Sequence, residues 1–171
     1  MTAETFDAIV TAPGFSLGIR ADDEAVTEVK FLEPRPAQAA SKPVAAEAAR
    51  QLAAWLLDPT VAFTVPLRPV GSDFQHRVWA QISAIPCGQT RSYGDLAQAL
   101  TTSPRPVGGA CGCNPLPVIV PCHRVVAANF RLPRTDQANE DFRGLGGFAH
   151  QRGGFLLDVK RWLLRHEQGR G

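Results

Sequence analysis

The residues best suited to carry out chemistry are a cysteine and a histidine that are adjacent in the chain, Cys122 and His123. A cysteine is a strong nucleophile only as a thiolate, and a neighbouring imidazole can take the thiol proton. A carboxylate that orients the imidazole would complete a nucleophile, a base and an orienting group. The dipeptide alone does not decide the matter, because a buried cysteine beside a structural histidine is the more common arrangement.

The other cysteines leave two further hypotheses open. A zinc module would use Cys111, Cys113, Cys122 and His123, but a Cys-x-Cys pair followed by adjacent Cys-His is poor spacing for tetrahedral zinc. A cysteine hydrolase would show a family signature around its nucleophile, and this sequence carries none. Neither a metal nor another cofactor is therefore expected.

The composition indicates a folded protein without a membrane segment. Hydrophobic residues make up 44% of the 171 residues and charged residues 20%, which is typical of globular domains. The first residues have neither a basic region nor an apolar one, and no run is long enough to cross a bilayer, so we expect a cytoplasmic protein with reduced thiols. The net charge of +2 permits nucleic-acid binding without requiring it.

The elements that must position the cysteine fall into two parts, which we expect to be domains at 1–70 and 71–171. The first part is predicted to hold three short strands and one helix that starts at a proline. These elements are Phe6–Val10, Phe15–Ile19, Ala25–Phe31 and the helix Pro43–Leu57. Two prolines between Thr60 and Gly71, Pro66 and Pro69, mark the boundary. This half shows no pattern of chemical residues.

The second part is predicted to be mostly helical. Its expected helices are Phe74–Ala84, a short one through Leu96 to Leu100 that begins at a Ser-x-x-Asp capping box, Arg105–Gly112 and Phe155–His166. Two short helices joined by the turn 101–104 have the outline of a helix-turn-helix unit. A long polar, Gly-rich loop is expected from 128 to 154.

Several sequence blocks in this part together resemble the O6-alkylguanine-DNA alkyltransferases. The blocks are Pro121-Cys122-His123-Arg124-Val125, Asn114-Pro115, the Arg-x-Val-Gly-Gly stretch 105–109, the segment 85–97 and the segment 160–167. The resemblance covers most of residues 72–171 and is loose before them. It implies an α+β protein, with a ribonuclease-H-like roll followed by a winged-helix-like domain that contains the helix-turn-helix.

The resemblance implies a suicide reaction in which Cys122 permanently accepts the alkyl group from O6-alkylguanine, with O4-alkylthymine as a second candidate substrate. His123 would take the thiol proton through a water, Glu167 would hold the imidazole, and Asn114 would fix the turn that presents the cysteine. The expected partner is double-stranded DNA carrying the lesion, bound by a monomer.

Four further residues are expected to contact DNA or the base. Tyr93 would donate a hydrogen bond to the departing guanine, and Arg105 would replace the extruded nucleotide in the stack. Arg124 and Gln75 are expected to make additional contacts. The helix that carries Arg105 would enter the minor groove, where its small residues let the backbone approach closely.

Three features depart from the family pattern. Pro106 follows Arg105, Cys111 and Cys113 lie at the end of the same helix, and about 25 residues separate Val126 from the Gly153-Gly154 pair. The long loop keeps a further alternative open, a non-catalytic sensor of alkyl lesions. A transcriptional regulator acting through the helix-turn-helix is a weaker alternative.

Overall fold

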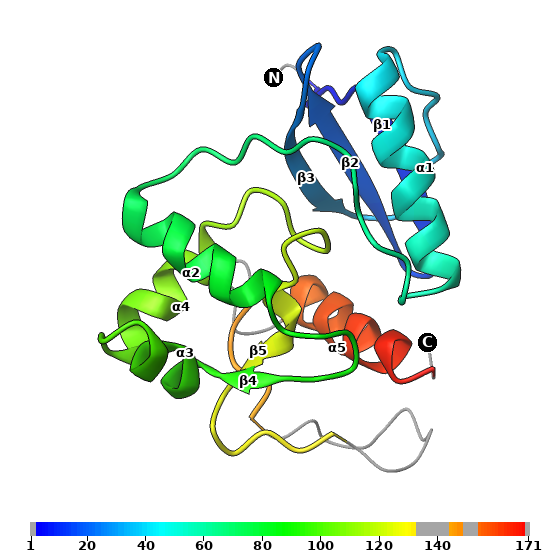
Figure 1. The fold of residues 1–171 in the computed structure, drawn as a ribbon. Coiled ribbons are helices and arrows are strands. Elements are labelled where there is room, and N and C mark those ends of the chain that lie inside the picture. Colours follow the sequence, from blue (N-terminus) through cyan, green and yellow to red (C-terminus); the bar gives the residue numbers. More distant parts are fainter. Residues whose placement is uncertain (1–2, 133–143, 149–153, 170–171) are drawn as a thin grey trace. The chain divides into compact units, whose positions relative to one another are not determined.

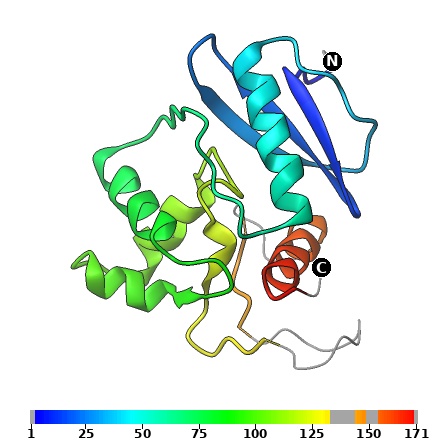
Figure 2. The same ribbon diagram turned by 45° about the vertical axis from the view of Figure 1, so that its right-hand side comes forward.

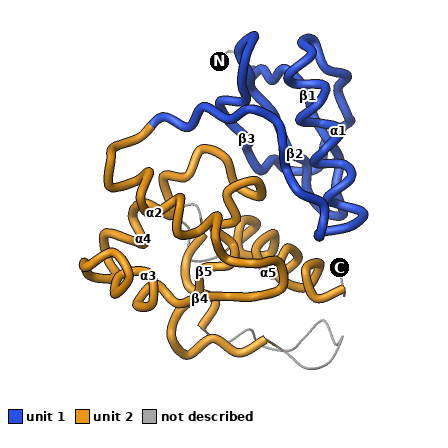
Figure 3. Tube along the Cα trace, in the orientation of Figure 1, with its two compact units in different colours: residues 1–70 blue, residues 71–171 orange. Residues whose placement is uncertain are grey.

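The structure is a computed structural model that describes residues 3–132, 144–148 and 154–169. The chain divides into two compact units, Met1–Val70 and Gly71–Gly171 (Figure 3). Each unit builds its own core.

The first unit is an antiparallel three-stranded sheet with one helix. Strands β1 (Ala8–Ala12), β2 (Phe15–Ala21) and β3 (Val26–Leu32) follow one another in the sheet order β1-β2-β3 (Figure 1). A tight turn at Pro13-Gly14 joins β1 to β2, and Gly14 has a φ of 83°, which glycine adopts at little cost. Branched and aromatic side chains that fit a pleated, half-buried surface fill the strands.

Helix α1 (Pro43–Leu57) runs along this sheet (Figure 2). The proline at its start needs no hydrogen bond from its nitrogen, which explains why the helix begins there. Its buried residues recur at helical spacing and include Ala45, Ala48, Leu52 and Trp55. Buried Gln51 accepts hydrogen bonds from the backbone of Thr64 at 2.9 Å and of Val65 at 3.2 Å, which holds the following segment against the helix.

The second unit contains the helix-turn-helix. Helix α2 (Asp73–Ser83) comes first, followed by α3 (Tyr93–Ala99) and α4 (Pro104–Gly112). Ser92 and Asp95 close the expected capping box at the start of α3, which satisfies two backbone donors. In the turn, Thr101 takes a left-handed φ of 55° and the Thr102 amide bonds to Ala97 at 2.9 Å.

Short elements then connect the helix-turn-helix to the last helix. Strand β4 (Arg91–Ser92) pairs in parallel with β5 (Val125–Val126), and the 3₁₀ turn η1 (Cys122–Arg124) precedes β5. Helix α5 (Phe155–Glu167) packs against η1. The β4–β5 pair fixes the start of α3 beside the end of the Cys122 segment, although the two are more than 25 residues apart in the chain.

The α+β class and the helices expected from the sequence are confirmed, with ends that differ by a few residues at most. Strand β1 starts two residues later than predicted, and the two-residue pair of β4 and β5 was not predicted. The long-loop expectation falls largely on 133–143 and 149–153, which lie outside the described residues. Within the described part, no helix is long and apolar enough to cross a membrane.

Candidate functional site

Cys122 lies at the end of a turn that Asn114 holds in place. The Asn114 side chain donates to the Val120 carbonyl at 2.8 Å and accepts from the Leu116 amide at 2.9 Å. Inside this turn Val118 has a φ of 72°, a strained conformation for a branched side chain. Asn114 and the backbone hydrogen bond from the Val120 amide to the Leu116 carbonyl therefore hold the segment in one unusual path, which presents Cys122 at the start of η1.

Burial controls the state of the nucleophile. The Cys122 side chain is only 6% exposed, and this burial raises the pKa of its thiol. A hydrogen bond from Asn114, the charge of Lys160 and backbone donors act in the opposite direction and lower that pKa. At rest Cys122 is therefore a thiol, and it needs a base to become a nucleophile.

The candidate base, His123, follows Cys122 in the chain and contacts a carboxylate of the last helix. His123 is fully buried, and its Nε2 lies 2.7 Å from Oε1 of Glu167 on α5. Burial lowers the pKa of His123, whereas the Glu167 charge and its hydrogen bond raise it. Although burial alone would raise the pKa of Glu167, His123 and Arg124 lower it to about 2, so the carboxylate is ionised.

A buried lysine and a tyrosine complete the surroundings of the thiol. Lys160 of α5 has no exposed surface, and its Nζ donates to the carbonyls of Val125 at 2.8 Å and Gly147 at 2.9 Å. The Tyr93 hydroxyl donates to the same Gly147 carbonyl at 3.2 Å. Burial lowers the pKa of Lys160 to about 8 and raises that of Tyr93, so both hold their protons at neutral pH.

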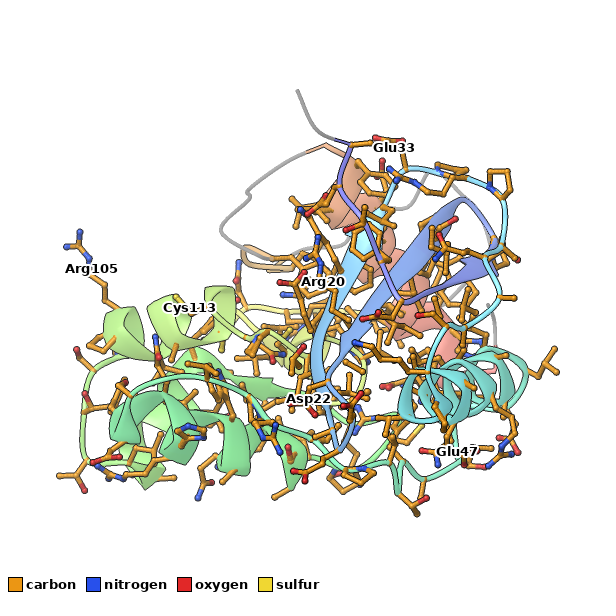
Figure 4. The ribbon with its side chains drawn as sticks, turned by 90° about the horizontal axis from the view of Figure 1, so that it is seen from above. Arg20, Asp22, Glu33, Glu47, Arg105 and Cys113 are labelled. Carbon is orange, nitrogen blue, oxygen red and sulfur yellow. The ribbon has the colours of Figure 1, made fainter. Side chains whose placement is uncertain are left out.

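An arginine in the first turn of α4 is exposed to solvent. Arg105 is exposed, and its side chain extends away from the helix (Figure 4). Val107 and Ala110 face the core, while a Cβ atom built on Gly108 or Gly109 would meet no atom within 4 Å. The outer face of α4 is thus small and open, with an arginine at its start.

The metal alternative gains no support from the side-chain positions. Among the described residues, which include Cys111, Cys113, Cys122 and His123, no group of three or more His, Cys, Asp or Glu side chains is placed to hold a metal ion. The histidine is instead engaged by a carboxylate, as a general base requires.

Comparison with known proteins identifies the family. Residues 73–169 match the family model of the 6-O-methylguanine DNA methyltransferase DNA-binding domain. A methylated-DNA–protein-cysteine methyltransferase of Methanosarcina mazei is 32% identical over 168 residues, which cover 94% of this chain and 95% of that protein. The chain belongs to the 6-O-methylguanine DNA methyltransferase family.

Other members extend the likeness to three dimensions. The crystal structure of the Mycobacterium tuberculosis O6-methylguanine methyltransferase superimposes with a TM-score of 0.71 at 30% identity and covers 95% of this chain and 92% of that one. A structure of the Mycobacterium tuberculosis protein in complex with DNA gives 0.69, with the same identity and coverage. A relative from Archaeoglobus fulgidus is 51% identical over 80 residues, 47% of this chain and 54% of that protein.

For a methyltransferase of this family, the structure brings together Cys122, His123, Glu167, Asn114 and Tyr93. Two of the residues expected to contact DNA have partners within the protein. The guanidinium of Arg124 forms a buried ion pair with Glu167 and donates to the Ile85 carbonyl at 2.6 Å. The Gln75 side chain closes the capping box of α2 by accepting from the Ser72 amide at 2.9 Å.

Lys160 is the site residue to which the sequence reasoning assigned no role. It stands on α5 among the apolar positions Leu156, Val159 and Leu163. A lysine inside an apolar helix face is a signal of a buried partner, since burial of an ammonium group needs hydrogen-bond acceptors. That signal is visible in the sequence, but its acceptors on Val125 and Gly147 are not.

Proposed function

We propose that this protein repairs DNA by moving the alkyl group of O6-alkylguanine onto Cys122, once per molecule. The observation that carries the proposal is the buried Cys122 next to His123, whose Nε2 is fixed by Glu167 at 2.7 Å. A thiol held protonated by burial, with an oriented imidazole beside it, is suited to activation only when a substrate is in place.

In the proposed step, the thiol proton of Cys122 passes to His123 through Nδ1, because Nε2 faces Glu167. The sulfur forms a bond to the alkyl carbon while the bond from that carbon to O6 of guanine breaks. The electron pair of the broken bond goes to the guanine. The product is a thioether, which does not hydrolyse, so the cysteine is not regenerated.

Tyr93 and Lys160 stabilise the charges that develop. The guanine becomes more negative as its O6–carbon bond breaks, and a proton or hydrogen bond from the Tyr93 hydroxyl offsets that charge. The raised pKa of Tyr93 keeps this donor protonated. The Lys160 ammonium favours the Cys122 thiolate, since it lowers the pKa of the thiol against the effect of burial.

DNA is the macromolecular partner of this chain, as the matching DNA-binding domain of the family indicates. We propose that α4 enters the minor groove with Gly108 and Gly109 toward the backbone, and that Arg105 fills the gap left by an extruded nucleotide. The reaction needs extrusion because a buried sulfur cannot reach a base inside the stack. The protein acts as a monomer in this scheme.

The test is incubation with a duplex oligonucleotide carrying O6-methylguanine, followed by mass spectrometry of the peptide that contains Cys122. We expect one methyl mass increment on Cys122 and none in Cys122→Ser, with normal guanine in the repaired strand. Tight lesion binding without any increment would instead support the sensor alternative. O4-methylthymine in the same duplex measures the second expected substrate.

A further inference from the structure

The Glu167 carboxylate contacts two basic side chains at once, Arg124 and His123. Arg124 donates from Nε to both carboxylate oxygens at 3.0 Å and from Nη2 to Oε1 at 2.6 Å. The same Oε1 lies 2.7 Å from Nε2 of His123. One oxygen therefore accepts from the guanidinium while it faces the imidazole, and the backbone amide of Gly88 reaches Oε2 at 3.4 Å.

This shared carboxylate lies where charges are poorly screened. The side chain of His123 is 0% exposed, that of Glu167 1% and that of Arg124 10%. Electrostatic interactions between such groups are stronger than at the surface, because little water lies between them. The permanent positive charge of Arg124 must therefore weaken the effect of the Glu167 carboxylate on the protonation of His123.

We propose that Arg124 is a positioning residue that acts through Glu167 to keep His123 neutral, and therefore able to accept the Cys122 proton, at physiological pH. The inference rests on the proposed function and assigns a role to an arginine that contacts neither DNA nor substrate in it. In the His–carboxylate pairs of hydrolases the carboxylate draws a proton onto the imidazole; here a second cation partly neutralises that carboxylate.

Among the described residues, the charged groups that act on the imidazole divide by sign: the anion favours the protonated form of His123 and the two cations favour the neutral form. From α5, Glu167 raises the pKa of His123 and Lys160 lowers it; from η1 itself, Arg124 lowers it, in addition to the larger lowering by burial. A histidine paired with an unneutralised buried carboxylate would gain a proton earlier as pH falls and could not act as a base. Arg124 thus extends toward lower pH the range in which His123 is neutral and can accept the Cys122 proton.

The Arg124 guanidinium also holds the Glu167 carboxylate in position beside His123. Its Nη1 donates to the Ile85 carbonyl at 2.6 Å, which ties the end of α2 to the Glu167 ion pair. Its planar fork reaches both carboxylate oxygens, a match that a lysine ammonium does not provide. Arg124→Lys therefore retains the charge but loses part of the orientation, which separates the two contributions.

The test compares the pH dependence of Cys122 alkylation in the wild-type protein, Arg124→Met and Arg124→Lys. O6-benzylguanine as the free base is one electrophile, and iodoacetamide is the second, because it reports the thiolate without any alkyltransferase activity. We expect Arg124→Met to move the acid limb of the rate profile upward by about one pH unit. Arg124→Lys is expected to keep the limb within a fraction of a unit while lowering the rate.

A direct titration of His123 by NMR checks the same shift where rates are low. A variant with both charges removed, Arg124→Met/Glu167→Gln, guards against a folding defect, because replacing a whole buried ion pair is better tolerated than breaking it. In this double variant the acid limb should move downward, below that of the wild-type protein. An Arg124→Met profile that loses amplitude with an unmoved acid limb and an unmoved His123 titration would overturn the proposal.

These outcomes are distinguishable from a failure of the proposed function. If the protein does not transfer alkyl groups from guanine, the oligonucleotide assay fails for every variant. The iodoacetamide profile and the His123 titration still report whether Arg124 sets the protonation of the imidazole.

Discussion

The Tyr93 hydroxyl and the Lys160 ammonium share one acceptor, the carbonyl oxygen of Gly147, at 3.2 and 2.9 Å. The ammonium also lies 5.9 Å from the centre of the Tyr93 ring. Both donors therefore meet at the Gly147 carbonyl at rest. The proposed reaction, however, requires the Tyr93 hydroxyl to turn toward the guanine. Because Lys160 donates to both Gly147 and Val125 itself, we expect the Gly147 carbonyl to keep a donor when the Tyr93 hydroxyl turns away.

Replacing Lys160 by methionine removes a buried cation that lowers the pKa of the Cys122 thiol. We expect Cys122 alkylation by free O6-benzylguanine at pH 7.5 to slow on the order of 10- to 100-fold, because the thiolate loses a buried positive neighbour. Mass spectrometry of reactions quenched at successive times measures the rate of alkylation. Lys30→Met, an exposed lysine of β3, is the matched control and should react like the wild-type protein. Equal rates in all three proteins would mean that Lys160 only holds the carbonyls of Val125 and Gly147 and does not activate the thiol.

The same lysine predicts how stability depends on pH. Its folded pKa is about 8 against 10.5 for the ordinary side chain, so between these values the unfolded chain binds a proton that the folded chain has released. The contribution of Lys160 to the free energy of unfolding should therefore rise with pH from about 8 to 10.5, by about 3 kcal/mol in total.

Urea denaturation at several pH values measures this effect as the difference between the wild-type protein and Lys160→Met. Subtraction removes the opposite trend from Cys122, Cys111 and Tyr93, whose raised folded pKa values make stability fall in the same range. A flat difference curve would mean that Lys160 retains its proton throughout, contrary to the prediction.

Glu167→Gln keeps the shape of the side chain but removes its charge. We expect transfer to slow by about 10²–10³-fold, because His123 loses the group that orients it and raises its pKa. The variant also leaves Arg124 buried without its carboxylate, which we expect to cost about 3–5 kcal/mol of stability. Circular dichroism melting and the oligonucleotide assay report the two effects separately. Activity close to that of the wild-type protein in a folded variant would rule out the orienting role of Glu167.

Gly146 leaves the space in which the Tyr93 ring lies. Its φ is 73°, and a Cβ atom built on it would come within 2.8 Å of the tyrosine Cε2. Gly146→Ala should therefore displace Tyr93 and slow transfer by about tenfold, in addition to a backbone cost of about 1–2 kcal/mol.

Gly14→Ala is the control for backbone strain, since Gly14 has a φ of 83° and nothing within 4 Å of its built Cβ atom. It should lose similar stability without any loss of transfer rate. If both alanine variants transfer at the wild-type rate, contact with Tyr93 does not limit the reaction.

Arg105→Ala tests the role of the exposed arginine at the start of α4. We expect repair of O6-methylguanine in duplex DNA to slow by about 10- to 100-fold, because an extruded nucleotide leaves an unfilled gap in the stack. Reaction with the free base O6-benzylguanine should not change. Arg50→Ala, on the exposed side of α1, is the control for loss of a positive charge. Equal losses on both substrates would refute the proposed role in extrusion.

Much of the fold could be predicted from local sequence. Pro43 at the start of α1, the Ser92 and Asp95 capping box of α3 and the spacing of apolar residues in α5 act within a few residues, so the sequence predicts those helices closely. The two-residue strands β4 and β5 could not be predicted, because a pair this short has no periodicity of its own and forms only when distant segments meet.

The chemistry divides in a similar way. Cys122 and His123 are adjacent, so their pairing as thiol and base is visible in the sequence alone. Glu167 lies 44 residues from His123 and 43 from Arg124, and only packing of α5 against η1 makes one carboxylate the partner of both. The sequence therefore assigned Arg124 to DNA and left Lys160 without a role, whereas the tertiary structure buries both cations. Burial decides their function, because a buried charge needs a partner inside the protein and a charge at the surface does not.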